Sequence, residues 1–344
     1  MTGKEYQGYR RPMGRLGGRF GVVSLLLGSV LAPGSAARAE RRPQSPPADA
    51  PITREAVTFT VVNPADGRRY PLAATRYDPS CVASTVVLLL HDLSYTKEVW
   101  DVPGYSVAEP FAHAGYSVVI LDRLGYGHSP LADGRQVSAL AYADMTGQVV
   151  DQLHKDKGGF MQVVLGGHGT GAEAAELEAG LNGGVAALMA LGYTHSPSRE
   201  LLADLAGGDV PRSAAADYEY FLGTPSHRAE MFYSGEADPA VVASDTDGAA
   251  ESPSGEIQSA WSQPSGKVLG RITVPVYLQL GQQDRLFPPD YLPAEGASFR
   301  SSPHVVTDVV PGAGHTFMLH PIGAESTFHL VSWVRNLPLT LPCS

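Results

Sequence analysis

The 344-residue chain has little charge, little cysteine and no long hydrophobic run. Charged residues make up 17% of it, with 25 Lys and Arg against 35 Asp and Glu. A membrane-spanning helix needs about 20 apolar residues in succession, and no segment is that long, so we expect no membrane span. The sequence also lacks metal-ligand spacing, a dinucleotide fingerprint and a P-loop. We therefore expect neither a cofactor nor a metal.

The first 39 residues have the charge and hydropathy of an export signal. Four arginines, including the pair Arg10-Arg11, precede a short apolar run over residues 21–31. The tripeptide A-R-A at residues 37–39 matches a cleavage site. We predict that the chain is exported and that residues 40–51 form a linker. The Arg10-Arg11 pair resembles that of a twin-arginine signal. An uncleaved, disordered basic tail is the alternative.

The charge balance bears on the kind of partner. The first 39 residues hold six Lys or Arg and one acidic residue, so the remainder has 19 basic and 34 acidic groups and a formal charge of −15. Such a surface repels nucleic acid and anionic lipid. We therefore expect no nucleic-acid partner and favour an apolar small molecule as substrate or ligand.

Strand and helix signals alternate along most of the chain. Helical stretches such as residues 106–114 and 137–154 separate short apolar runs that are typical of buried strands. This alternation predicts an α/β fold with a mostly parallel sheet and helices on both faces, and ligands bound beyond the carboxyl ends of the strands. The expected strands are residues 57–62, 70–76, 86–90, 116–121, 161–165, 186–191, 274–280 and 304–310.

One interval is too long for a simple crossover. Residues 196–270 contain several short amphipathic pieces with aromatic and acidic side chains. Long insertions at the ligand edge usually serve binding, so we predict a helical cap here. The core then comprises residues 52–195 and 271–344. A peripheral insertion with its own small core is the alternative.

The two cysteines suggest one disulfide in an exported chain. Cys81 shortly precedes the strand at residues 86–90 and so lies near that strand's amino-terminal edge. The last helix, at about residues 324–336, should run back from the opposite edge and bring Cys343 to the same side. We predict a Cys81–Cys343 bridge, with two unpaired thiols as the alternative.

The segment L-G-G-H-G-T-G at residues 165–171 lacks the residue that its pattern calls for. It lies between an apolar strand and a helix-forming run, which is the setting of a G-x-S-x-G nucleophile elbow. Gly167 and Gly171 occupy the two small positions, and Gly169 stands where the serine belongs. Glycine has no side chain and cannot attack a substrate. The frame of a serine hydrolase is present without its nucleophile.

Four further segments complete a family pattern. His91 follows the third strand, residues 122–129 form D-x-x-G-x-G-x-S, residues 281–284 form G-x-x-D, and residues 312–315 form G-x-G-H. The order elbow, acid, histidine is the one that α/β-hydrolases use. Over about residues 57–337 the chain resembles the capped esterases, lipases and epoxide hydrolases of the α/β-hydrolase superfamily.

The resemblance implies roles for the two terminal elements. His315 matches the family's general base, and Asp284 matches the acid that would accept a hydrogen bond from its other ring nitrogen. A His–Asp pair kept only as a structural relic is the alternative. Tyr95, Trp100 and Tyr126 are candidate pocket residues, although each suits the core or the rim equally well.

Asp92 is a second departure from the family pattern. The family usually has glycine after the loop histidine, and the backbone N–H groups of Leu93 and Thr170 match its oxyanion donors. A carboxylate beside those donors opposes the negative charge that ester hydrolysis develops. Asp92 either turns outward to cap a turn or faces His315 as a second acid/base group.

Three functions remain open. The first is an enzyme without an acyl-enzyme intermediate, in which His315 and Asp284, with Asp92 as a further group, move protons in a cyclisation, elimination, isomerisation or direct attack by water. The second is a non-catalytic protein whose pocket binds a ligand or partner. The third is an ordinary esterase or lipase whose serine has been removed, against which Asp92 argues.

Overall fold

The computed structural model describes residues 51–155, 159–207, 219–222, 225–260 and 262–339. The expected export signal, the linker up to residue 50 and Cys343 lie outside these residues. Export and the Cys81–Cys343 disulfide therefore stay predictions. Within the described ranges, no helix is long and apolar enough to cross a membrane.

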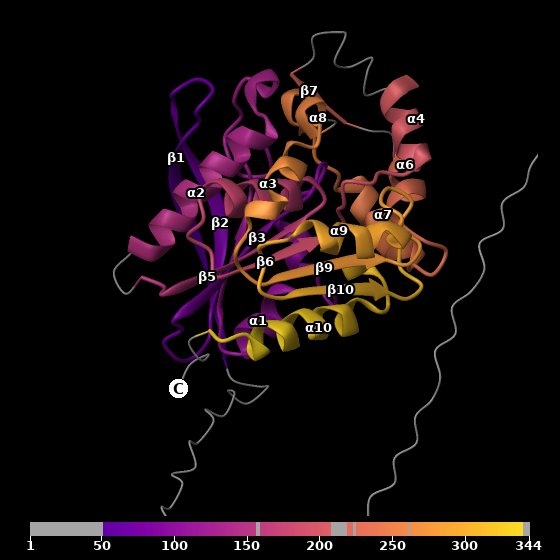
Figure 1. Cartoon of the computed structure of the whole chain (residues 1–344). Helices are drawn as coiled ribbons and strands as arrows, with labels where there is room; N and C mark the ends of the chain where they lie inside the picture. The colour runs from indigo at the N-terminus through magenta and orange to yellow at the C-terminus, as the bar shows by residue number, and fades with distance from the viewer. Residues whose placement is uncertain (1–50, 156–158, 208–218, 223–224, 261, 340–344) are drawn as a thin grey trace, which may run out of the picture. The chain divides into compact units, whose positions relative to one another are not determined.

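In the described part of the chain, eight strands form one sheet in the order β1-β2-β4-β3-β5-β6-β9-β10 (Figure 1). β1 and β2 form an antiparallel hairpin, β2 pairs antiparallel with β4, and the remaining neighbours are parallel. All eight predicted strands and the mostly parallel sheet are confirmed. The strands are β1 (Thr53–Val62), β2 (Arg69–Asp78), β3 (Thr85–Leu90), β4 (Ser117–Leu121), β5 (Gln162–His168), β6 (Ala187–Leu191), β9 (Val276–Gly281) and β10 (Val305–Val310).

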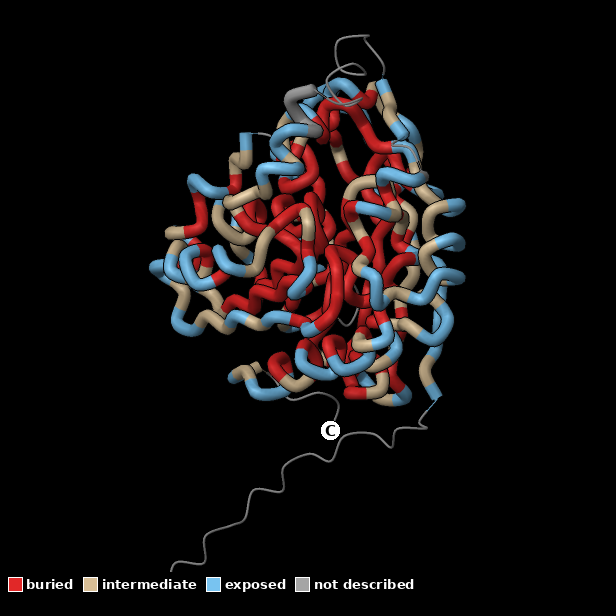
Figure 2. The backbone as a smooth tube through the Cα atoms, turned by 90° about the vertical axis from the view of Figure 1, so that its right-hand side faces the viewer, coloured by how far each residue is buried: buried red, intermediate tan, exposed pale blue. Residues whose placement is uncertain are grey.

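The central strands are buried on both faces, which explains their unbroken apolar runs. Every residue of β3 is buried, and Figure 2 shows buried segments, in red, through the interior of the molecule. Val86, Leu88 and Leu90 belong to one hydrophobic cluster, whereas Val87 and Leu89 belong to another. Successive strand residues point to opposite faces of the sheet. A strand between two apolar layers therefore needs apolar side chains at its odd and its even positions.

Helices cover both faces of the sheet. Figure 1 shows α2 and α3 on one side and α1 and α10 on the other, and each pair contributes to the cluster on its own side. The core helices are α1 (Ala108–His113), α2 (Ala139–Lys155), α3 (Thr170–Leu181), α9 (Leu292–Ser298) and α10 (Gly323–Asn336). The 3-10 turns are η1 (Lys97–Asp101), η2 (Gly134–Gln136), η3 (Pro264–Lys267), η4 (Leu269–Arg271), η5 (Pro289–Tyr291) and η6 (Phe317–Leu319).

In its described residues, the insertion between β6 and β9 is mainly helical and includes one short strand pair. It is tied to the core by a buried ion pair between Arg123, just after β4, and Glu256. The hydroxyl of Tyr126 donates to the same carboxylate at 2.6 Å. The described elements of the insertion are α4 (Arg199–Gly207), β7 (Tyr220–Phe221), α6 (Pro225–Phe232), α7 (Pro239–Asp247), β8 (Ser252–Pro253) and α8 (Ser254–Ala260).

The turn from β5 into α3 depends on close backbone approach. Gly169 has φ 52° and ψ −121°, the strained geometry of a sharp strand-to-helix turn. A Cβ atom on Gly167 would overlap the carbonyl group of Gly171, and one on Gly171 would overlap the carbonyl oxygen of His91. The two flanking glycines let the helix start directly against the neighbouring strand end.

Alanine at either flanking position should therefore destabilise the fold. We expect Gly167→Ala and Gly171→Ala each to lower the free energy of unfolding by about 1–3 kcal/mol, because a methyl group must displace packed backbone. Gly235→Ala is the control, since no atom lies within 4 Å of its added Cβ, and it should change stability by less than about 0.5 kcal/mol. Urea unfolding measures all three, and equal midpoints would contradict this account.

Candidate active site

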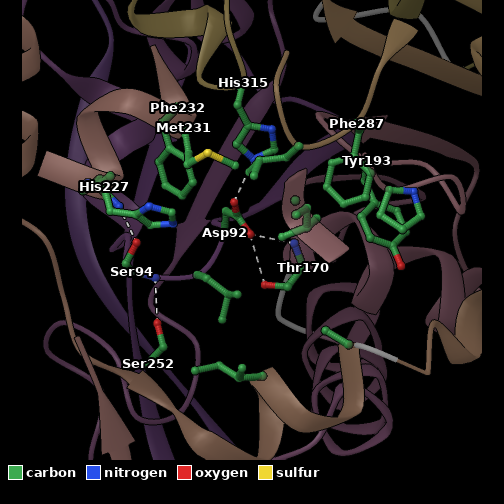
Figure 3. A pocket seen from close by; sticks show the side chains of 18 of the residues that line it. Asp92, Ser94, Thr170, Tyr193, His227, Met231, Phe232, Ser252, Phe287 and His315 are labelled. Carbon is green, nitrogen blue, oxygen red and sulfur yellow. Dashed lines mark hydrogen bonds and ion pairs between the residues drawn. The ribbon is translucent and has the colours of Figure 1, made fainter. Parts of the chain in front are cut away.

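The structure brings together three of the predicted site residues, one after each of three strands. Asp92 follows β3, Asp284 follows β9, and His315 follows β10. The ring of His315 lies between the two acids. Its Nδ1 is 2.9 Å from Asp284 Oδ2, and its Nε2 is 3.0 Å from Asp92 Oδ2, a contact that Figure 3 shows. Carboxyl ends of parallel strands meet at one edge of a sheet, which is why distant segments converge here.

The second oxygen of Asp92 binds the start of α3. Asp92 Oδ1 accepts a hydrogen bond of 2.7 Å from the backbone N–H of Thr170 and one of 3.2 Å from its hydroxyl. Gly169, the N-cap residue, offers no side-chain cap, so a carboxylate from another strand caps this helix end. The N–H that the family resemblance assigns to the oxyanion is thus occupied by Asp92.

The carboxylate also fills the space that a nucleophile would need. A Cβ atom on Gly169 would overlap the carboxyl group of Asp92. Of the two orientations expected for Asp92, the structure has the one that faces His315. The Asp92 carboxylate therefore lies where the side chain of a serine at position 169 would begin.

Charge favours an ion pair at this position. Burial opposes ionisation of Asp92, but the hydrogen bond and charge of His315 outweigh it and hold the pKa of Asp92 below its ordinary value. Burial likewise opposes the charged form of His315, but Asp284 and then Asp92 raise the pKa of His315 above its ordinary value. A carboxylate and an imidazolium that compensate each other explain how both remain buried.

His168, the last residue of β5, lies beneath the elbow and close to the same pair. It is fully buried, and its Nε2 bonds to the backbone oxygen of His315 at 3.0 Å. Its Nδ1 points toward Asp92 Oδ2 at 3.8 Å and has no hydrogen-bond partner. Burial and then the charge of His315 lower the pKa of His168 to about 4.

A cavity of about 230 Å³ opens above these residues, between the core and the insertion. Asp92, Gly169, Thr170 and His315 line one side of it together with Leu93. The rest of the wall is mostly apolar. Its larger apolar side chains include Leu201, Phe221, Met231, Phe232, Ile257, Leu286 and Phe287.

Three aromatic residues differ from the expectation, because none of them lines this cavity. Trp100 is fully buried in the hydrophobic core. Tyr126 bonds to the insertion through Glu256, and the hydroxyl of Tyr95 lies 2.7 Å from Thr316 Oγ1. The loops around the site need large side chains to pack against one another, and aromatic residues in such loops serve that purpose.

Sequence reasoning missed a cation in the cavity wall. Arg228 of α6 lines the cavity with a buried side chain. Its guanidinium lies 4.0 Å from the ring centroid of Tyr95 and 2.9 Å from Asp245 Oδ2. A lone arginine in a polar stretch of the insertion carries no signal that distinguishes it from a surface residue.

Sequence reasoning also missed a group of buried carboxyl groups behind the cavity wall. Glu173 and Glu176 on α3 are fully buried, and burial raises the pKa of each to about 8. Next to them, Nδ1 of His195 lies 2.7 Å from Glu295 Oε1, and this pairing raises the pKa of His195 to about 9 despite its burial. The alternating Ala and Glu of α3 is typical of an exposed helix, so the pattern gave no warning.

The family model of the alpha/beta hydrolase family matches residues 87–324. The chain therefore belongs to the α/β-hydrolase superfamily. This membership confirms the resemblance that the elbow, acid and histidine segments indicated. No curated protein sequence matches the chain.

Solved structures share the fold at low sequence identity. A thermophilic esterase from Thermogutta terrifontis is 19% identical, covers 81% of this chain and 98% of its own, and has a TM-score of 0.64. An esterase from Exiguobacterium antarcticum is 20% identical and has a TM-score of 0.62. Its match covers 81% of this chain and 100% of the esterase chain. Rv0554 from Mycobacterium tuberculosis is 15% identical, covers 82% and 100%, and has a TM-score of 0.64.

The buried carboxyl group of Glu173 should make stability depend on pH. Its pKa is raised from 4.5 to about 8 in the fold, so the folded chain holds a proton that the unfolded chain releases at lower pH. The stability contributed by this protonated group is complete below about pH 4.5 and is lost as the pH rises through about 8. Glu176, Tyr193, His195 and Glu256 are the charged or titratable groups that act on it.

We expect Glu173→Gln, which cannot ionise, to lose less unfolding free energy than the unsubstituted protein between pH 5 and pH 8.5. Urea unfolding at both pH values measures the difference. Glu325→Gln, at an exposed position on α10, is the control and should follow the unsubstituted protein. If the free energy of unfolding changed equally with pH in all three proteins, Glu173 would not have a raised pKa in the fold.

Proposed function

We propose that this protein is an enzyme that moves protons on an apolar small molecule without a serine ester intermediate. One observation carries the proposal: the Asp92 carboxylate lies in the nucleophile's place, bonded to both Thr170 N–H and His315. The apolar cavity above it supports an apolar substrate. Sequence features of residues 1–39 support export as a further part of the proposal.

The pair of Asp92 and His315 has what a two-proton relay needs. Asp92 Oδ2 accepts a proton from one substrate atom while His315 Nε2 donates one to another, and the pair returns to its starting state through the hydrogen bond that joins them. Asp284 holds His315 through Nδ1 and fixes the ring's orientation. Elimination, isomerisation and cyclisation all have this proton balance, and the same pair can take a proton from an attacking water.

Acyl transfer fits this geometry poorly. A tetrahedral intermediate needs the Thr170 N–H for its oxyanion, but that N–H donates to Asp92. The fixed negative charge of Asp92 would also repel a developing oxyanion in this mostly apolar cavity. These two features argue against an esterase that has lost only its serine.

Restoring a serine nucleophile should require two substitutions together. We expect Gly169→Ser alone to stay inactive toward p-nitrophenyl butyrate, because the new side chain would overlap Asp92. Asp92→Gly alone has no nucleophile. The double variant has a serine at position 169, with no Asp92 carboxylate to overlap it or to occupy the Thr170 N–H. Its ester hydrolysis should exceed that of either single variant by about 10³-fold.

Covalent labelling by a serine-directed phosphonate compares the same proteins without relying on ester hydrolysis. Intact mass spectrometry should find the label on the double variant and not on the unsubstituted protein. Strong ester hydrolysis by Gly169→Ser alone would show that Asp92 does not hold this position. Phosphonate labelling of the unsubstituted protein would overturn the proposed function.

Loss of His315 should abolish turnover of the natural substrate. We expect His315→Ala to lower the rate by about 10²–10⁴-fold, the range of general acid/base contributions. The measurement is substrate loss from a lipophilic extract, followed by untargeted mass spectrometry. His304→Ala, at an exposed histidine just before the other end of β10, is the matched control. Equal consumption by His315→Ala and the control would exclude a catalytic His315.

A second candidate is a non-catalytic ligand-binding protein. It is favoured by the pairing of both Asp92 oxygens within the protein, which leaves a largely apolar wall facing the cavity. In that case a compound from the same extract would copurify with the protein, unchanged in mass, and would also copurify with His315→Ala.

A further inference from the structure

Three donor atoms from three separate segments converge beside the cavity. Asp92, His168 and His315 are all buried, and one ligand atom of each lies within 4.8 Å of the other two. We propose that these three residues form a binding site for a divalent transition-metal ion of the zinc or ferrous iron class. This set of two imidazoles and one carboxylate is an established donor set for such ions.

The hydrogen bonds of the two histidines leave the correct nitrogens for an ion. His168 Nε2 faces the carbonyl oxygen of His315 at 3.0 Å. A carbonyl can only accept, so Nε2 carries the hydrogen and Nδ1 has the free lone pair. His315 Nδ1 faces the carboxylate of Asp284 at 2.9 Å, so Nε2 is the nitrogen directed at Asp92, to which it is hydrogen-bonded at 3.0 Å. An ion would take the place of the proton in that hydrogen bond.

These same bonds supply the outer support that metal-binding histidines usually have. A ligating imidazole normally donates its other N–H to a carboxylate or a backbone carbonyl, which fixes the ring's orientation. His315 has the carboxylate of Asp284, and His168 has the carbonyl of His315. Both rings are therefore held in place by contacts that an ion would not disturb.

An independent observation points into the triangle. His168 Nδ1 is a fully buried polar atom with no hydrogen-bond partner, and it lies 3.8 Å from Asp92 Oδ2. Buried polar atoms are rarely left unpaired, and such an atom calls for an explanation. An ion about 2.1 Å from each donor would pair Nδ1 and also compensate the buried Asp92 carboxylate, and the three donors would have to move closer together to bind it.

The remaining coordination positions of the ion would face the cavity. Asp92 and His315 line the cavity, whereas His168 lies beneath them, so the protein closes one side of the ion only. Catalytic zinc sites keep three protein ligands and one open position in this way. The inference goes beyond the proposed function, because it concerns whether a proton or a metal ion lies between Asp92 and His315.

Zinc stoichiometry tests the site. The full chain is prepared without a polyhistidine tag and incubated with zinc sulfate. Excess metal is removed by gel filtration, and the bound zinc is measured by inductively coupled plasma mass spectrometry. We expect about one equivalent in the unsubstituted protein. His168→Gln and Asp92→Asn each remove one ligand and should weaken zinc binding about tenfold or more.

His195→Gln is the matched control, since His195 is also mostly buried beside a carboxylate but lies outside the triangle. It should retain the full equivalent. X-ray absorption of the unsubstituted zinc protein needs no variant and should show two imidazole nitrogens at about 2.0–2.1 Å. A metal-free unsubstituted protein, zinc without imidazole ligands, or equal binding by His168→Gln would each overturn the inference.

The same preparations separate this inference from the proposed function. Turnover that depends on His315 in a protein that binds no zinc would overturn the metal site and leave the proposed function standing. Stoichiometric zinc on two imidazoles, without turnover in either the loaded or the chelator-treated protein, would support the metal site and overturn the proposed function.

Discussion

The need to compensate one buried carboxylate governs the arrangement of the whole site. Asp92 is only 4% exposed, and an ionised carboxylate in such a place loses hydration worth several kcal/mol unless charges and hydrogen bonds replace it. The positive end of α3 supplies one partner through Thr170 N–H, and His315 supplies the other. Asp284 then holds His315 in position from behind. Removing any of these partners would leave the buried charge of Asp92 or His315 without full compensation beside an apolar cavity.

The two departures from the family pattern are one structural change. A side chain at position 169 and the carboxylate at position 92 compete for the same space, so Gly169 is what allows Asp92 to reach the start of α3. The turn nevertheless keeps the strained geometry of a nucleophile elbow. Loss of a serine alone would have left an empty position beside a free N–H. Here the position is filled and the N–H is bonded, which is why we infer a rebuilt site and not a disabled esterase.

Much of the fold was predictable because buried parallel strands must be apolar on both faces, and β3 illustrates this in five successive residues. His315 and Asp284 were predictable because each lies in the loop after a core strand, in a segment that matches the family pattern. The direction of Asp92 was not, since a residue just after a strand can turn either way and the position of α3 decides. Glu173 was not predictable either, because only tertiary packing separates a buried glutamate from an exposed one in the same helical pattern.

The cation between Asp92 and His315 determines which reactions the site can perform. With a proton in the hydrogen bond between them, the pair would exchange protons with a substrate. With the metal ion that we propose, the same donors would hold a Lewis acid, which would supply polarisation of a bound oxygen atom. The mostly apolar wall strengthens either interaction by excluding water. His168 is what separates the two cases, because a proton shared by Asp92 and His315 leaves its Nδ1 unpaired, whereas an ion would bind it.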